Sequence, residues 1–159
     1  MIQSYFHAEK QGGFIALSIG IFTCFLGGCF FLKPAAPFYI GMAIPLTLIG
    51  IVQMAVGTTV SRRSDRQAED LEKLLSEDSA EFSRQEAPRM AAVMRSFVLY
   101  RWVEIGIVAM GLILILLNRE VNFWKGLGAG MFAQAVIMLL FDFFAEKRGR
   151  AYSTFIQER

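Results

Sequence analysis

Three ionisable residues interrupt long apolar stretches of the sequence, and their side chains are the ones best placed to do chemistry. Arg101 and Glu104 lie three positions apart, so they share one face of a helix. Asp142 lies near the end of the last apolar stretch. A charged group in apolar surroundings is costly unless it pairs, reaches water or serves a function. We therefore expect these three side chains to pair with one another or with neighbouring charges.

These residue types allow two interpretations, one structural and one functional. Arg101 with Asp142, and Glu104 with Lys10 or Arg95, are candidate salt bridges that hold helices together. Alternatively, Glu104 and Asp142 line a polar vestibule used for proton coupling, ion passage or ligand binding, because a carboxyl group shielded from water can carry a proton. The closeness of Arg101 favours paired and ionised carboxylates.

Residues typical of catalytic sites are scarce in this sequence. Its single histidine, His7, cannot form a multi-histidine metal site, and HAEK does not match the two-histidine zinc motif. Neither a GxSxG nucleophile motif nor a Ser/Lys pair within the apolar stretches is present. We expect a protein that is not an enzyme and that has no metal or cofactor.

Four apolar stretches dominate the chain and must position these charges. Of the 159 residues, 55% are hydrophobic, and the mean hydropathy is +0.45. Each stretch is about as long as the ~20-residue helix that crosses the hydrocarbon core of a bilayer. The sequence predicts one all-α membrane domain, residues 1–159, built as a bundle of four transmembrane helices. The predicted spans are residues 14–32, 38–60, 97–117 and 127–145.

The distribution of Lys and Arg predicts the orientation, because basic residues resist translocation across the membrane. The segment between the second and third spans, residues 61–96, holds seven basic residues, whereas the first connection has only Lys33 and the third only Arg119 and Lys125. We expect both termini in the cytoplasm and the protein in a bacterial inner membrane. The net charge of +2 does not favour nucleic-acid binding. Four basic residues follow the last span: Lys147, Arg148, Arg150 and Arg159.

The segment of residues 61–96 shows a helical pattern of apolar residues. The pattern predicts a short amphipathic cytoplasmic helix at about residues 65–75, a turn at residues 76–79, and a second helix that starts before Pro88 and runs into the third span. The first helix either docks on a membrane surface or partner, or packs its leucines onto the bundle. The stripe comprises Leu71, Leu74, Leu75 and Phe82, and the candidate capping boxes are Ser64 with Gln67 and Ser83 with Glu86.

Alternating helix directions bring the ionisable residues into one layer near the cytoplasmic side. Arg101 and Glu104 begin the third span, Asp142 ends the fourth, and the residues before the first span approach the same depth. This convergence is the most specific signal in the sequence. The predicted polar layer comprises Arg101, Glu104, Asp142, His7, Glu9, Lys10 and Arg95.

Small residues within the predicted spans indicate where helices approach closely. Gly126 and Gly130 have the small-xxx-small spacing that lets membrane helices meet at backbone distance. We expect Gly50, Gly57 and Gly106 to serve the same purpose.

In size, span number and cytoplasmic termini, the chain resembles the small inner-membrane immunity proteins that protect bacteria against pore-forming toxins. The resemblance implies a protein that binds a membrane partner, or a second copy, through its helices within the lipid bilayer. A small transporter or channel subunit that uses Glu104 and Asp142, and an accessory subunit of a larger membrane complex, are the alternatives. Residues 105–117 carry no polar side chain, so no polar path across the third span is visible, and binding is ranked above transport.

Overall fold

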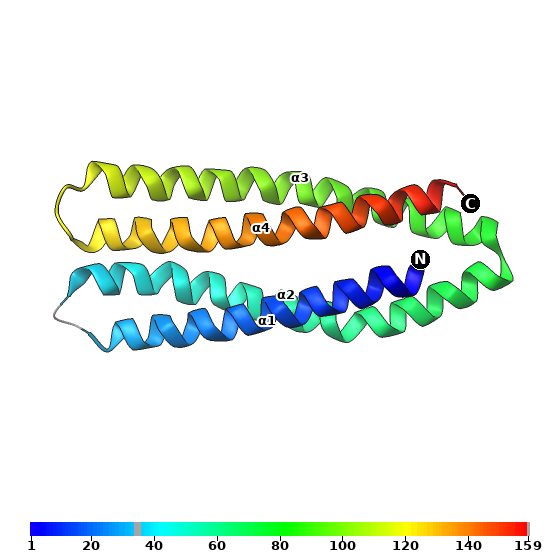
Figure 1. The fold of residues 1–159 in the computed structure, drawn as a ribbon, viewed down its shortest axis with the longest axis horizontal. Helices are drawn as coiled ribbons and strands as arrows, with labels where there is room; N and C mark the ends of the chain where they lie inside the picture. Colours follow the sequence, from blue (N-terminus) through cyan, green and yellow to red (C-terminus); the bar gives the residue numbers. More distant parts are fainter. Residues whose placement is uncertain (34–35, 159) are drawn as a thin grey trace.

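The structure is a computed structural model that describes residues 1–33 and 36–158 (Figure 1). It consists of four α-helices, and the described residues form no strand, which confirms the predicted all-α class. Part of the first predicted connection, residues 34–35, and Arg159 of the basic tail lie outside the described residues. The helices are α1 (Ile2–Phe31), α2 (Pro37–Glu77), α3 (Ser79–Leu117) and α4 (Phe123–Gln157).

All four helices are long and apolar enough to cross a membrane, and each continues well beyond its apolar stretch. The 41 residues of α2 correspond to about 60 Å at 1.5 Å per residue. The short connections between α1 and α2 and between α3 and α4 lie at one end of the molecule. Both termini and the turn between α2 and α3 lie at the other end (Figure 1). We call these the apolar end and the polar end.

The segment between the second and third spans differs from the prediction of a separate amphipathic helix. Residues 61–77 of this segment belong to α2, which runs unbroken to Glu77, and residues 79–96 belong to α3. Ser64 caps no helix start, because its hydroxyl donates to the Val60 carbonyl at 2.7 Å inside α2. No glycine or proline lies between residues 58 and 77 to end the helix, so the apolar stretch and the leucine stripe form one element.

The turn at the polar end falls within the predicted interval, but the helix that follows it begins earlier than its second capping box implied. Asp78 is the N-cap of α3, and its side chain accepts hydrogen bonds from the amides of Ala80 and Glu81 at 2.9 and 3.0 Å. Ser83 and Glu86 lie inside α3. An aspartate at the N-cap satisfies two of the amides that a helix start leaves unpaired.

The helices form two antiparallel hairpins, α1/α2 and α3/α4, which meet through α2 and α4 (Figure 1). Among the described residues, the backbones of α1 and α3 stay apart, and these two helices meet only through side chains at the polar end, where Arg89 lies over the ring of Phe6 at 5.7 Å. The helices are therefore arranged in the order α1, α2, α4, α3, and they do not form the closed ring of a regular four-helix bundle. In agreement, only 11% of the most apolar 18-residue stretch of α3 is buried inside the protein, compared with 39% of the corresponding stretch of α2.

Glycine contacts set the register of the α1/α2 hairpin. A Cβ added at Gly20 would lie 2.6 Å from the Gly50 carbonyl oxygen, and one at Gly57 would lie 2.5 Å from that of Gly13. The glycines of α1 recur every seven residues, at 13, 20 and 27, as Ala43, Gly50 and Gly57 do along α2. A seven-residue repeat keeps one face of a helix against its partner, as in a coiled coil.

Glycines also bring α2 and α4 together near the apolar end. Gly126 lies against the backbone of Phe38, and a Cβ at Gly130 would lie 2.8 Å from the Met42 carbonyl oxygen. Gly106 departs from its expected packing role, because it is exposed and no atom lies within 4 Å of the position that a Cβ would take. The physical reason is that α3 contacts mainly α4, and Gly106 lies on another face of α3.

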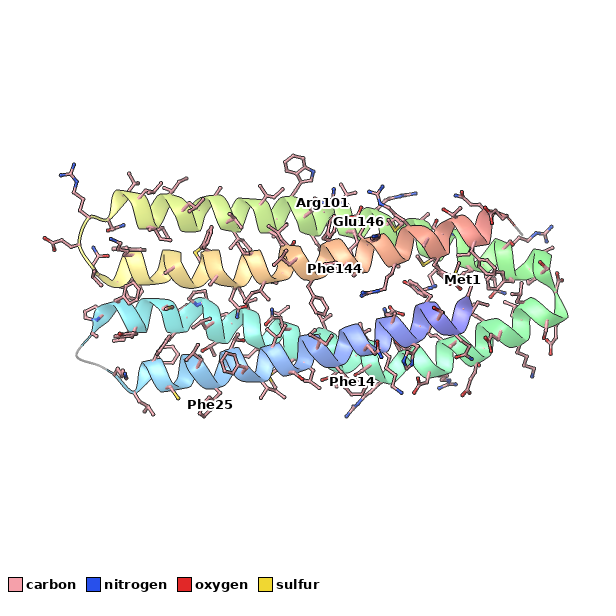
Figure 2. The ribbon with its side chains drawn as sticks, in the orientation of Figure 1. Met1, Phe14, Phe25, Arg101, Phe144 and Glu146 are labelled. Atoms are coloured by element: carbon pink, nitrogen blue, oxygen red, sulfur yellow. The ribbon has the colours of Figure 1, made fainter. Side chains whose placement is uncertain are left out.

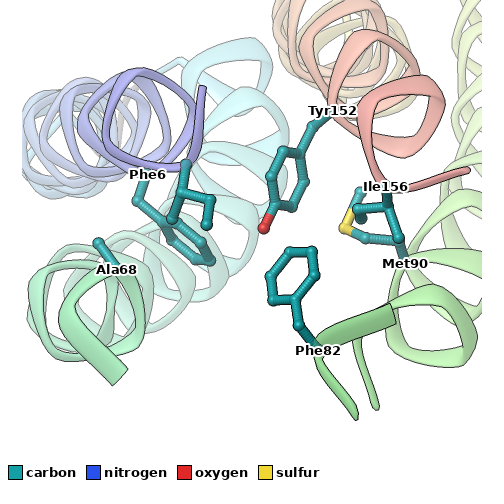
Figure 3. Packing of buried hydrophobic residues seen from close by; sticks show 7 residues of the cluster. Phe6, Ala68, Phe82, Met90, Tyr152 and Ile156 are labelled. Atoms are coloured by element: carbon teal, nitrogen blue, oxygen red, sulfur yellow. The ribbon is translucent and has the colours of Figure 1, made fainter. Parts of the chain in front are cut away.

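At the polar end, all four helices contribute to one hydrophobic core (Figure 3). Leu71, Leu74 and Leu75 pack against this core, so the stripe predicted from the sequence faces the protein. An ion pair lies beside this core, where the buried Glu86 accepts two hydrogen bonds from the partly exposed Arg89. The core residues are Ile2, Phe6, Ala68, Phe82, Met90, Tyr152 and Ile156.

Candidate acidic site between α3 and α4

Glu104 lies in the seam between α3 and α4, at a position set by the register of this hairpin. A Cβ at Gly111 would lie 2.8 Å from the Gly128 carbonyl oxygen, and Met90 packs beside Gly149 farther toward the polar end. One face of α3 meets α4, and it carries residues at intervals of seven. These residues are Met90, Phe97, Glu104 and Gly111. The seam therefore forces Glu104 into the protein, and only 1% of this residue is exposed.

The carboxylate of Glu104 has no cationic partner. Neither of its oxygens accepts a hydrogen bond from an N–H or hydroxyl group within the described part of the chain, and the Asp142 carboxyl can bond to it only when one of the two acids carries a proton. The half-buried Asp142 of α4 is the neighbouring charged group, and the two carboxyl groups are close enough to repel each other when both are ionised. Both acids border a small cavity of about 100 Å³. Its walls are formed by Phe97, Arg101, Glu104, Leu139, Asp142, Phe143 and Glu146.

Arg101 forms its ion pair with Glu146, not with Asp142 (Figure 2). Glu146 also accepts from Arg150 at 2.5 Å, and its side chain is 8% exposed. Helical side chains lean toward the N-terminus of their own helix. This tendency directs Arg101 toward the polar end, away from Glu104 and toward the turn of α4 beyond Asp142.

The charges of this site do not balance when every group is ionised. Three carboxylates, those of Glu104, Asp142 and Glu146, face the two guanidinium groups of Arg101 and Arg150. One negative charge remains, and it lies on the Glu104–Asp142 side because both guanidinium groups bond to Glu146. An acidic pair of this kind can bind a proton or a monovalent cation. No cluster suited to hold a metal ion occurs among the residues described.

The remaining members of the predicted polar layer lie elsewhere. Arg95 is exposed on α3, and the ionisable groups of α1 bond within the α1/α2 hairpin, so the predicted pairing of Glu104 with Lys10 or Arg95 is not formed. The order of the helices explains the result for Lys10, because α1 and α3 are on opposite edges. Arg95 precedes Glu104 on α3 by about two and a half turns, which places it on the opposite side of that helix. The bonds of the α1 groups are Lys10 to Asp65 (2.5 Å), Arg63 to Glu9 (3.2 Å) and Gln11 to His7 (3.1 Å).

Two buried polar contacts were not predicted from the sequence. Gln134 of α4 is fully buried, and its amide lies 3.5 Å from that of Gln53 and 3.4 Å from the Leu46 carbonyl oxygen. A glutamine in the middle of each of two apolar stretches was the available signal, because polar side chains there bond across helices. Glu146 was also missed, since it lies one residue beyond the predicted fourth span.

Comparisons of the chain with protein-family models, with curated proteins and with solved structures find no match. The fold and the acidic site define the class to which this protein belongs. In its described residues it is an all-helical protein with four helices that are long and apolar enough to cross a membrane, and a buried glutamate, Glu104, lies beside the half-buried Asp142 between the last two.

Proposed function

We propose that this chain is a non-catalytic membrane protein that acts by binding another membrane protein through the outer face of α3. This outer face is the exposed stripe of Trp102, Gly106, Ala109 and Ile113, spaced as neighbours along one side of the helix. The observation that carries the proposal is Gly106, which has no atom within 4 Å of its Cβ position although Trp102 and Ile113 on either side are 69% and 48% exposed.

Small residues at exposed positions of a membrane helix allow a second helix to approach its backbone. Twelve of the 14 glycines have neighbouring atoms within 4 Å of a Cβ position, so their small size is used inside the chain. Gly106 and Gly28 are the two exceptions. Gly28 lies three residues from the end of α1, whereas Gly106 lies well inside its helix between large apolar side chains. The outer face of α3 is therefore the better docking surface.

The proposed partner is either a toxin or another subunit of a membrane complex. An immunity role, in which a membrane-targeting toxin is bound and inhibited, agrees with the resemblance in size and span number. Binding within a larger complex as an accessory subunit uses the same surface. Transport is the second candidate function, because the buried Glu104 and the half-buried Asp142 form an acidic pair. It ranks lower because residues 105–117 of α3 carry no polar side chain beyond that pair.

Site-specific photo-crosslinking in native membranes tests the proposed surface. A photoreactive residue at Ile113 should yield one discrete adduct with a membrane protein, and Gly106→Leu should strongly reduce it. The matched control position is Phe25 of α1, which is 70% exposed and should not yield that adduct. Because Gly106 has open space around it and leucine favours a helix over glycine, Gly106→Leu should not lower the melting temperature in detergent.

Three results would contradict this function. Equal adducts from Ile113 and Phe25 would indicate random encounters, and an adduct that Gly106→Leu leaves intact would show that the outer face is not the contact. An adduct of twice the mass of the chain would identify a second copy in place of a different membrane protein.

A further inference from the structure

We propose that the cavity between α3 and α4 is a binding site for the ammonium group of a small primary amine, held by Glu104 and Asp142. This inference goes beyond the proposed partner binding and does not depend on it. The cavity lies between the two helices, whereas the outer face of α3 lies on another side of the helix.

When every group is ionised, the site has one unbalanced negative charge, so a ligand with one positive charge would neutralise it. Arg101 and Arg150 both bond to Glu146, which leaves the Glu104 and Asp142 carboxyl groups facing each other. A buried charge is destabilising unless a counter-charge and hydrogen bonds compensate it. A proton shared by the two carboxyl groups, or a monovalent cation between them, restores the balance, and the cavity beside them has room for the cation. A divalent ion such as Ca²⁺ takes six or more oxygen ligands, which is more than these two side chains supply.

The hydrogen-bonding groups favour a primary ammonium. Glu104 is 1% exposed, borders the cavity, and has two carboxylate oxygens without a hydrogen-bond partner in the described structure. An –NH₃⁺ group has three donors and no acceptor, so it can donate to both Glu104 oxygens and to Asp142. A quaternary ammonium has no N–H and leaves those oxygens unsatisfied, which is costly in a buried site.

The size and lining of the cavity limit the rest of the ligand. Its volume of about 100 Å³ is smaller than the ~150 Å³ cavity that accepts benzene. The cavity therefore suits an ammonium that carries a short alkyl chain. Phe97, Leu139 and Phe143 supply apolar walls for that chain, and an aromatic ring attracts a nearby cation.

The surroundings of the cavity allow the ammonium to come from two sources. Two of its bordering residues are accessible, since Phe143 is 62% exposed and the Arg101 side chain 43% exposed. The site also lies near the end of the apolar stretches of α3 and α4. A soluble alkylamine and the ethanolamine headgroup of a phospholipid both present the same –NH₃⁺ chemistry there.

Titration calorimetry with ethylammonium tests the proposal on the full chain in phosphatidylcholine nanodiscs. Saturable binding with one site per chain is expected, and tetramethylammonium should not bind. Glu104→Gln and Asp142→Asn should each weaken ethylammonium binding by about tenfold or more, since each removes a charged hydrogen-bond acceptor. Leu139→Phe fills the cavity and keeps both carboxyl groups, so it should also weaken binding. Glu120→Gln removes an exposed acid at the apolar end and is the matched control.

Nanodiscs that contain phosphatidylethanolamine distinguish the two sources. Weaker ethylammonium binding there assigns the site to the lipid headgroup, and unchanged binding assigns it to a soluble amine; both results support the shared chemistry. The absence of saturable binding in phosphatidylcholine overturns the proposal, even if the acidic pair takes up a proton. Equal binding of tetramethylammonium overturns it as well, as does wild-type affinity in a folded Glu104→Gln or Leu139→Phe variant.

Discussion

At the scale of single residues, two buried glutamates on neighbouring helices differ in their partners. Glu146 accepts hydrogen bonds from Arg101 and Arg150, whereas Glu104 receives none from the described residues. The same residue type is therefore a structural counter-ion on α4 and an uncompensated acid on α3. Stability measurements on neutral variants can separate these two situations.

We expect Glu146→Gln to destabilise the protein by about 1–3 kcal/mol, because it leaves the guanidinium groups of Arg101 and Arg150 without their carboxylate. Glu104→Gln keeps the shape of the side chain and removes an unpaired buried charge. It should leave the stability unchanged or raise it. Melting temperatures of both variants in the same detergent check this pair of expectations. A lower melting temperature for Glu104→Gln than for Glu146→Gln would show that Glu104 has a stabilising partner.

At the scale of the helices, glycine determines how closely neighbouring backbones approach. The seven-residue repeat of small residues places Gly13, Gly20 and Gly27 of α1 against small residues of α2. A methyl group in this seam would meet backbone atoms, which cannot rotate away as a side chain can. The packing of the α1/α2 hairpin therefore depends on the absence of Cβ atoms.

The change Gly57→Ala should destabilise the α1/α2 hairpin, because its Cβ would lie 2.5 Å from the Gly13 carbonyl oxygen and 2.6 Å from the Leu17 amide nitrogen. Overpacking of this kind costs about 1–3 kcal/mol. Gly28→Ala is the matched control, since nothing lies within 4 Å of its Cβ position and alanine favours a helix by up to about 1 kcal/mol. Thermal unfolding in detergent should show a lower melting temperature for Gly57→Ala only. Equal melting temperatures would mean that the hairpin can separate without loss of stability.

At the scale of the whole molecule, the two ends of the long helices differ in chemistry. The apolar end has short connections, and the polar end holds the hydrophobic core of Figure 3, the ion pair of Glu86 with Arg89 and most basic residues. Basic segments stay on the cytoplasmic side of a membrane. The polar end is therefore the expected cytoplasmic end.

Cysteine labelling tests this orientation in spheroplasts, in a variant whose native cysteines, Cys24 and Cys29, are replaced by alanine. A membrane-impermeant maleimide should label Glu120→Cys in intact spheroplasts. It should label Glu77→Cys, at the end of α2, only after permeabilisation. The reverse pattern would place the polar end and the acidic site outside the cytoplasm, against the distribution of basic residues.

The helical class and the four long apolar elements were predictable from the sequence, and so was the turn near Asp78. These features depend on local properties, namely the length of an apolar stretch and the residues that can end or cap a helix. The continuity of α2 was not predicted. Ser64 looked like a capping residue, but the apolar contacts of Leu71 and Leu74 keep the helix intact across it.

The spacing of residues along the chain places Arg101, Glu104 and Asp142 near one end of long apolar helices. The packing of the helices adds that Arg101 pairs with Glu146 and that Glu104 lies beside Asp142 without a cation. Pairing across helices depends on which helices are neighbours and in what register. Here the glycine contacts set both, because they put α2 and α4 in the centre and leave α1 and its Lys10 on the edge opposite α3.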